Sequence, residues 1–410
     1  MISIIVLIFV FILIAKRQVG NFNFDIWQIM LGGAVAVLIT NQISVPDALS
    51  SINIDVILFL FGMFVVAVAL EDSGYLSHLI SVLTGNVKSV DTLVFYLLFG
   101  AGLASAILMN DSLAIIGTPV VLLISKKHNI NAKMLLIVLA FAITIGSVMS
   151  PIGNPQNLLI AIHGNIHNSF LNFLQYLFIP TIINLFAAFL IIRIFYRKQF
   201  NHLILHHSEE PVKDINLANI SKASLLIMLV LISIKVTMAF LDEGAEFKLT
   251  YIALAASLPE LLFSKRRIEI VKKIDWHTLI FFASMFILMQ SVWNTGIFQE
   301  IIKDSHFNFA SVFLILVVGI LLSQLISNVP LVALYLPVLM SNNVALKGMM
   351  ALAAGSTIAG NLFILGAASN IIIIQNAEKK AGETITFFEF AKVGIPVTIF
   401  NALIYYLFLK

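Results

Sequence analysis

The chain has 410 residues, of which 60% are hydrophobic and only 11% are charged, and its mean hydropathy is +1.03. This composition excludes a soluble globular domain and predicts an all-α polytopic membrane protein that lies in the lipid bilayer. The absence of cysteine excludes disulfides and thiolate metal sites, and the net charge of +3 is too small to suggest a nucleic-acid partner.

Apolar runs predict the elements of the first half. In chain order we expect spans over residues 2–15, 27–40 and 55–70, an interfacial segment over 75–83, two apolar arms over 92–109 and 112–125, a long run over 134–162, and a span over 171–192. A membrane-spanning helix needs about 20 residues, so each arm is short for a span. We therefore expect the arms to form a re-entrant hairpin with Asn110-Asp111 at its tip.

The second half follows a polar segment over residues 202–221, which we interpret as a linker. After it we expect spans over 223–241, 249–263 and 276–292, two arms over 309–326 and 331–340 around Ser327-Asn328-Val329-Pro330, an interrupted span over 348–376, and a last span over 393–409. The predicted organisation is a first repeat over 1–200, a cytoplasmic linker over 201–222 and a second repeat over 223–410.

One polar stretch, Ser150-Pro151-Ile152-Gly153-Asn154-Pro155-Gln156-Asn157, interrupts the apolar run over residues 134–162. Proline removes a backbone donor and clashes with the preceding turn, so the helix must break there. In hydrocarbon a broken backbone is tolerated only where it is buried in protein or lines a wet cavity. We therefore expect a discontinuous helix at the membrane midplane, which is how many transporters build a substrate site. The alternative is a surface loop between two short helices.

The two halves repeat the spacing of their polar positions. Nine residues lie from Asn110 to Pro119 and from Asn328 to Pro337, and four from Gly153 to Asn157 and from Gly366 to Asn370. We expect the protein to lie in the cell (inner or plasma) membrane. Placing the basic clusters at the ends of the spans in the cytoplasm leaves both termini outside and the linker in the cytoplasm. The repeats are then inverted, with five spans and one re-entrant hairpin each, as in transporters that work by alternating access.

We expect the two hairpin tips and the two breaks to converge and bind the substrate and its ion. Helix N-termini favour oxygen-rich or anionic groups, while free carbonyls and amide oxygens favour Na⁺. The alternative is that these amides only satisfy loose backbone groups at turns. The predicted binding residues are Asn110, Asp111, Ser112, Ser150, Gly153, Asn154, Gln156, Asn157, Ser327, Asn328, Gly366, Ser369 and Asn370.

Asp111 is the predicted coupling residue. A carboxylate in an apolar hairpin costs several kcal/mol unless it is paired, neutralised or hydrated, and it commonly marks an ion pathway. It would either coordinate Na⁺, with Asn110 and Asn154 as further candidate ligands, or carry the coupling proton. The bland alternative is an aspartate that caps the second arm. Val329 stands at the matching position of the second tip, which predicts one special ion site rather than two.

These motifs resemble the ion-transporter superfamily. Met109-Asn110-Asp111, the stretch over 150–157 and Ser327-Asn328-Val329-Pro330 are similar to those of its arsenite-permease and D-type Na⁺/H⁺ antiporter branch, which is citrate-transporter-like and has divalent-anion symporter relatives. The resemblance implies a scaffold domain, a transport domain, an elevator mechanism and a homodimer. It also implies that Asn110, Asn154, Asn328 and Asn370 line the sites and that Asp111 serves coupling. The dicarboxylate branch usually has Ser-Asn-Thr at both tips, whereas this chain has Asn-Asp-Ser and Ser-Asn-Val.

The expected function is a secondary active transporter, not an enzyme. It would move a small inorganic oxyanion or its neutral acid, such as arsenite, coupled to H⁺ or Na⁺, with no other cofactor. The alternatives are a Na⁺/H⁺ antiporter and a Na⁺-coupled, citrate-like carboxylate permease. A third, an intramembrane enzyme, lacks a nucleophile with a base or metal cluster near the breaks. The sequence has no Gly-rich nucleotide-binding loop, and a separate ATPase subunit stays open.

Replacing Asp111 with Asn should abolish coupled transport and leave folding intact, because the amide keeps the shape of the side chain but neither carries the charge nor takes up a proton at neutral pH. Flux into proteoliposomes measures the first effect and thermal unfolding the second. Full activity in this variant would contradict the assignment.

Overall fold

The computed structural model describes residues 2–16, 18–19, 22–75, 78, 87, 89–164, 166, 168–200, 212–240, 248–297, 300, 311–326, 328–342 and 344–410. Apart from a short antiparallel ladder between β1 (Gln18–Val19) and β2 (Phe22–Asn23), the regular structure of this part of the chain is helical. The predicted all-α class is therefore confirmed. Six of the described helices are long and apolar enough to cross a membrane.

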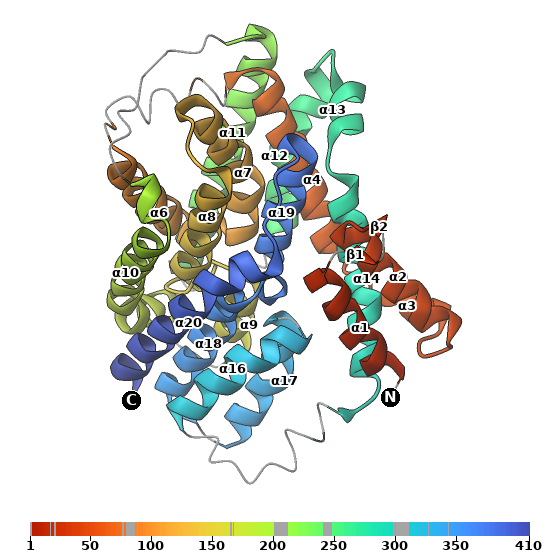
Figure 1. The fold of residues 1–410 in the computed structure, drawn as a ribbon, viewed down its shortest axis with the longest axis vertical. Helices are drawn as coiled ribbons and strands as arrows, with labels where there is room; N and C mark the ends of the chain where they lie inside the picture. The colour runs from red at the N-terminus through yellow and green to blue at the C-terminus, as the bar shows by residue number, and fades with distance from the viewer. Residues whose placement is uncertain are drawn as a thin grey trace.

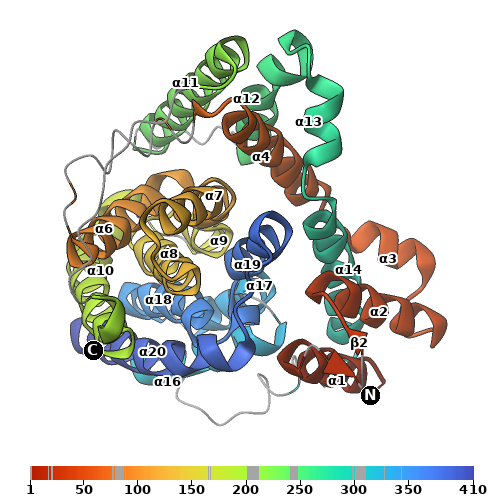
Figure 2. The same ribbon diagram turned by 45° about the horizontal axis from the view of Figure 1, so that its top comes forward.

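The helices fall into two groups, which Figures 1 and 2 show beside each other. The outer group consists of α1 (Ile2–Lys16), α2 (Ile26–Ile39), α3 (Val45–Ser51), α4 (Ile54–Asp72), α11 (Ile215–Phe240), α12 (Leu249–Phe263), α13 (Arg267–Lys273) and α14 (Trp276–Trp293). The bundle consists of α6 (Val90–Leu108), α7 (Asn110–His128), α8 (Ala132–Ser147), α9 (Pro155–His163), α10 (Ser169–Phe195), η1 (Arg197–Gln199), α16 (Val312–Ile326), α17 (Asn328–Ser341), α18 (Leu346–Leu362), η2 (Ile364–Gly366), α19 (Ala368–Ala381) and α20 (Phe387–Leu409).

Most predicted spans coincide with a helix, and several differences have local causes. The arms were expected to be too short to span, but α6 and α7 have 19 residues each. Of these two helices, α6 is long and apolar enough to cross a membrane and α7 is not. α11 begins at Ile215, inside the segment expected to be a linker, where the Asp214 carboxylate accepts from the N–H of Leu217. The short helices α3 and α13 were not predicted. Most of the expected interfacial segment over 75–83 and residues 201–211 lie outside the described part.

The chain reverses at the junction of α6 and α7. The start of α6 lies beside the end of α10, since the Asp91 carboxylate pairs with Arg193 at 3.1 Å. The end of α7 lies there too, because the N–H of Asn131, which follows α7, donates to Gln199 at 3.4 Å. In Figure 1 both chain termini lie at one end of the molecule and α13 lies at the other.

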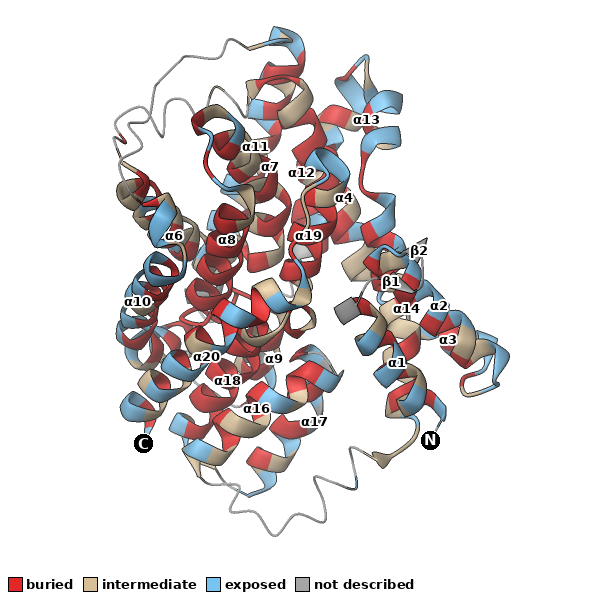
Figure 3. Ribbon diagram, viewed as in Figure 1, coloured by how far each residue is buried: buried red, intermediate tan, exposed pale blue. Residues whose placement is uncertain are grey.

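The centre of the bundle is formed by α8 and α18. All residues from Met134 to Ser147 and from Gly348 to Asn361 are buried (Figure 3). α6 packs on α8 and α16 packs on α18. Small residues allow these close crossings: a Cβ on Gly146 would lie 2.0 Å from the carbonyl oxygen of Gly102. The polar helix ends described next are therefore held inside tightly packed protein.

Replacing Gly146 with Ala should lower the thermal stability of the purified protein, because α6 and α8 must separate to admit the methyl group; overpacking of this kind costs about 1–3 kcal/mol. Gly100→Ala is the matched control, since nothing lies within 4 Å of a Cβ at that position of the same helix pair. Equal melting temperatures for the two variants would contradict the close crossing.

Candidate transport site

The first break lies between the end of α8 at Ser147 and the start of α9 at Pro155. The last carbonyls of a helix have no partner within the helix. Here the Nδ2 of Asn157 donates to the carbonyl oxygens of Ser147 (3.1 Å), Val148 (3.2 Å) and Ser150 (3.1 Å). Asn154 caps α9 by accepting from the N–H of Asn157 at 2.8 Å. The polar stretch thus satisfies a broken backbone that is buried in protein.

The second break, between α18 and α19, is closed in the same way. The Nδ2 of Asn370 donates to the carbonyl of Gly360 at 2.6 Å, and the Nε2 of Gln324 on α16 donates to that of Ala359 at 2.8 Å. In both breaks the amide side chain reaches a carbonyl ten residues earlier, Asn157 to Ser147 and Asn370 to Gly360. Backbone carbonyls at the ends of α8 and α18 therefore fix which way these amides point.

One hydroxyl joins the two halves. The Oγ1 of Thr357 on α18 lies 3.2 Å from the Nδ2 of Asn154 and 3.4 Å from the Nε2 of Gln156, and it donates to the Oδ1 of Asn157 at 3.2 Å. The corresponding threonine of the first half, Thr144 on α8, lies against the second break, with its methyl group 3.2 Å from the place a Cβ on Gly360 would take. Each central helix thus contacts the break of the other half.

The first hairpin tip also reaches the first break. The N–H of Asn110 donates to the carbonyl of Gly153 at 3.0 Å. Met109, just before it, has φ of +63°, a conformation that side chains rarely adopt. Met109 is the N-cap of α7 and no side chain caps this helix, so Asp111 lies in the first turn and is not the cap that the alternative interpretation required.

The second tip is described from Asn328, which is buried at the start of α17. α17 packs against α9 and α18, next to both breaks. Ser327 lies outside the described residues. Hydrogen bonds therefore join the first tip to the first break and the first break to α18, and helix packing brings the second tip beside them.

Several buried oxygen atoms of the tips, the second break and the neighbouring helices have no hydrogen-bond partner among the described residues: the Oδ1 of Asn110, Asp111, Asn328 and Asn370, the Oε1 of Gln324, and the hydroxyls of Thr144 and Ser369. The two nitrogens of Asn370 and Gln324 are fixed by the carbonyls to which they donate, so their oxygens are the atoms left over. A buried acceptor without a donor costs about 1–3 kcal/mol. Such a set suits a ligand that carries hydroxyl donors or a cation.

Other predicted residues support the breaks instead. Gly153 and Gly366 permit close approach, since a Cβ would lie 2.2 Å from the Ser147 oxygen and 2.3 Å from the Ala359 oxygen. The hydroxyl of Ser150 accepts from the N–H of Ile152 at 3.3 Å. Ser112 is buried in the first turn of α7. The Asn154 and Gln156 amides bind protein groups.

Sequence reasoning missed Thr144, Ser147, Gln324 and Thr357. The repeat would have paired Thr144 with Thr357, because Thr144 precedes Gly153 by the same number of residues as Thr357 precedes Gly366. Gln324 carries no such signal, since it lies in an apolar run. The described residues hold no group of three or more His, Cys, Asp or Glu that could bind a metal ion.

Comparison with known proteins decides the family. The sequence profile of the citrate transporter family, CitMHS, matches residues 8–347. The chain belongs to the citrate transporter family. It is therefore a multi-pass secondary transporter of small solutes and not an enzyme.

Two relatives that match nearly the full length are transporters by name. The uncharacterized transporter Rv2684 of Mycobacterium tuberculosis (strain ATCC 25618 / H37Rv) is 26% identical over 422 residues, which cover 97% of this chain and 95% of the relative. The silicon efflux transporter LSI3 of Oryza sativa subsp. japonica is 26% identical, and the alignment covers 90% of this chain and 88% of the rice protein. Among solved structures, the YdaH transporter of Alcanivorax borkumensis aligns with 99% of this chain and 95% of its own, at 15% identity and a TM-score of 0.48.

Replacing Thr357 with Val should destabilise the protein by about 1–3 kcal/mol, because the isosteric methyl leaves Asn154, Gln156 and Asn157 without their shared partner. Thr357→Ser is the matched control and should retain most of the stability, since it keeps the hydroxyl. Thermal unfolding of the purified variants measures both. A valine variant as stable as the serine variant would show that this junction does not join the halves.

Proposed function

We propose that the protein transports a small, neutral, multiply hydroxylated inorganic acid, such as arsenous or silicic acid, coupled to H⁺ or Na⁺. The observation that carries the proposal is the set of unpartnered buried acceptors, above all the oxygens of Gln324 and Asn370. Hydroxyl groups of an undissociated acid donate hydrogen bonds, and each donor would satisfy one of these oxygens. Because no thiol exists in the chain, arsenite recognition would run through its hydroxyls.

The same chemistry disfavours a carboxylate substrate, although the family takes its name from citrate. A carboxylate presents only acceptors at neutral pH, which would face acceptors of the protein. Residues 109–113, 147–157, 328–332 and 360–370 contain no lysine or arginine that could neutralise it. The likeness to the silicon efflux transporter of rice favours a hydroxylated acid independently.

Coupling is assigned to Asp111. Its Oδ1 is buried, has no partner among the described residues and belongs to the residue next to the unpartnered Asn110 oxygen. A carboxylate and an amide oxygen together suit Na⁺, and the carboxylate alone can carry a proton. Of the three residues expected to hold Na⁺, Asn154 is committed to Ser147, Asn157 and Thr357, so Asn110 and Asp111 supply the uncommitted oxygens. The same pair supports Na⁺/H⁺ antiport as the second candidate function.

Alternating access between inverted repeats is the proposed mechanism. Its support is the matched pair of amide-to-carbonyl contacts in the two breaks and the matched packing of α6 on α8 and α16 on α18. We assign the outer group as the scaffold and the bundle as the moving domain of an elevator in a homodimer. The basic end that holds α13 would face the cytoplasm, with both termini outside and the two hairpins re-entrant.

Flux into proteoliposomes tests the proposal. We expect uptake of arsenite or silicic acid, driven by a pH or Na⁺ gradient, and no uptake of citrate. Asn370→Leu should reduce this flux by about tenfold or more, since it removes an acceptor and frees the Gly360 carbonyl, a loss of about 1.4 kcal/mol or more. Lys272→Gln, on the surface of α13, is the control and should transport normally.

Exchange of Na⁺ for H⁺ without any solute would replace this proposal by the antiporter. Citrate flux without arsenite or silicate flux would replace it by the carboxylate permease.

A further inference from the structure

The helix α19 connects the candidate site to the outer group. Its 14 residues span about 21 Å and begin with Ala368, Ser369 and Asn370 at the second break. Ala368 and Ile371 line a small apolar space against α1, α2 and α14. Gln375 and Lys379 continue the same face at the spacing of one helical turn.

The far end of α19 contacts the junction between α13 and α14. The Lys379 ammonium donates to the carbonyl oxygens of Lys273 at 2.9 Å and Ile274 at 2.5 Å, and it lies 4.0 Å from the Asp275 carboxylate. These carbonyls precede the N-cap of α14, which is Asp275. One lysine thus binds three groups at the junction between α13 and α14.

A second contact lies one turn closer to the site. The Thr278 hydroxyl is 2.7 Å from the Oδ2 of Asp275 and 2.6 Å from the Oε1 position of Gln375, whose Nε2 position has no partner. The single proton of the Thr278 hydroxyl cannot be donated to both oxygens. The oxygen and nitrogen of an amide side chain are assigned from the surrounding hydrogen bonds, so the Gln375 amide can be flipped. With the amide turned, Gln375 donates to Thr278, and Thr278 donates to Asp275. The α14 N-cap is then held by Gln375 and Lys379 together.

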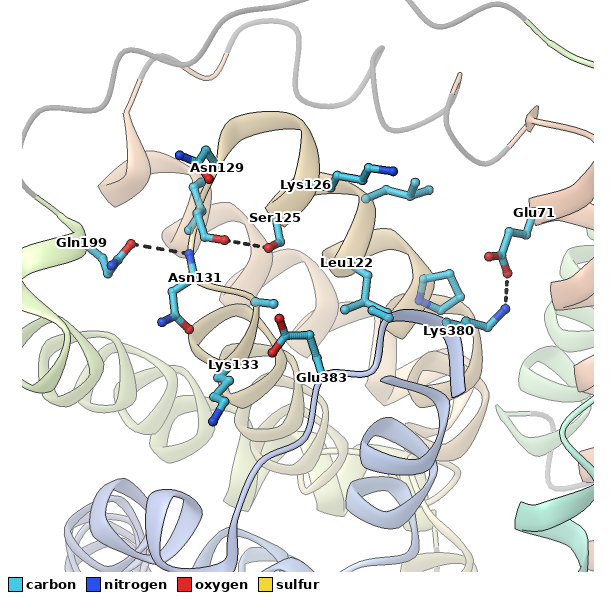
Figure 4. Close-up of a pocket in the computed structure, with 15 residues that line it drawn as sticks. Glu71, Leu122, Ser125, Lys126, Asn129, Asn131, Lys133, Gln199, Lys380 and Glu383 are labelled. Carbon is cyan, nitrogen blue, oxygen red and sulfur yellow. Dashed lines mark hydrogen bonds and ion pairs between the residues drawn. The ribbon is translucent and has the colours of Figure 1, made fainter. Parts of the chain in front are cut away.

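Lys380, which follows Lys379 in α19, pairs with Glu71 at the end of α4 (Figure 4). This pair lines a cavity of about 730 Å³ whose walls also include Lys126, Lys133 and Glu383. Beyond the pair, a space of about 20 Å³, room for about one water molecule, lies between α4, α7 and α19 and is lined by Phe64, Ile115 and Asn376.

One face of α7 runs from the cavity to the candidate site. Lys126, Leu122 and Pro119 line the large cavity and Ile115 lines the small space. Asp111 follows one turn further along the same face, since the steps between these positions are three or four residues. The seam between α4, α7 and α19 therefore leads from the cavity towards the coupling carboxylate.

We propose that Gln375, Lys379 and Lys380, in contact with Glu71 and the first turn of α14, form a clamp that closes this seam, and that solute or ion passes along the α7 face when the clamp opens. The role in transport rests on the proposed function, whereas the closure rests on the contacts alone. Beside the clamp, Lys273 pairs with Asp72 at 2.7 Å and so holds α13 against the end of α4 within the outer group.

The absence of native cysteine makes the test direct. Ile115→Cys is placed in the full chain and its reaction with a small membrane-impermeant methanethiosulfonate is timed from the side of the large cavity. Ile115 is 0% exposed, so reaction requires opening of the seam. Lys380→Glu and Glu71→Lys should each speed the reaction about tenfold, which corresponds to about 1.4 kcal/mol, and the two together should restore the slow rate.

Lys272→Gln is the matched control, because Lys272 is an exposed lysine on the neighbouring α13. Ala67→Cys, which lines the same small space, replaces Ile115→Cys if that variant does not fold. Unchanged rates in both single variants, or a double variant as fast as the singles, would overturn the clamp. The labelling needs no substrate, so faster labelling without arsenite or silicate flux would retain the clamp and reject the proposed function alone.

Discussion

The structure depends on one constraint: a helix that ends inside a low-dielectric interior must find partners for its last carbonyls. Asn157 supplies them for α8, and Asn370 and Gln324 for α18. Donating through nitrogen fixes each amide and leaves its oxygen turned away from the helix end. The residues that make the breaks tolerable therefore also create buried acceptors beside the breaks.

The two halves use these acceptors differently. In the first half the Asn157 oxygen accepts from Thr357, so it joins the halves and is closed to a ligand. At the second break the matching atoms are the Asn370 oxygen and the hydroxyl of Thr144 from the first half, and neither has a hydrogen-bond partner among the described residues. Together with Asp111, whose counterpart in the second half is Val329, this makes the two halves unequal in polarity, and α19 runs from the second break to the outer group.

The sequence predicts what depends on local chemistry. Proline, glycine and amides in the stretch over 150–157 break any helix, so the position of the first break follows from the chain itself. Thr357 and Gln324 could not be predicted, because each lies in an apolar helix and acquires its partner only when α18 meets the first break or α16 meets α18. Lys379 and Lys380 were recognisable as basic residues near a helix end, but their partners on α4 and α14 lie far away in the chain. The start of α11 was missed because its first turn is polar.

The central claim is that the leftover oxygens bind the hydroxyls of a small inorganic acid. Anomalous X-ray scattering from crystals of the protein grown with arsenite, recorded at the arsenic absorption edge, locates the ligand directly. The account predicts one arsenic peak within hydrogen-bond reach of the side-chain oxygens of Asn110, Gln324 and Asn370. A peak confined to the large cavity beside Lys126 and Lys380, or an ordered arsenic remote from both breaks, would contradict it.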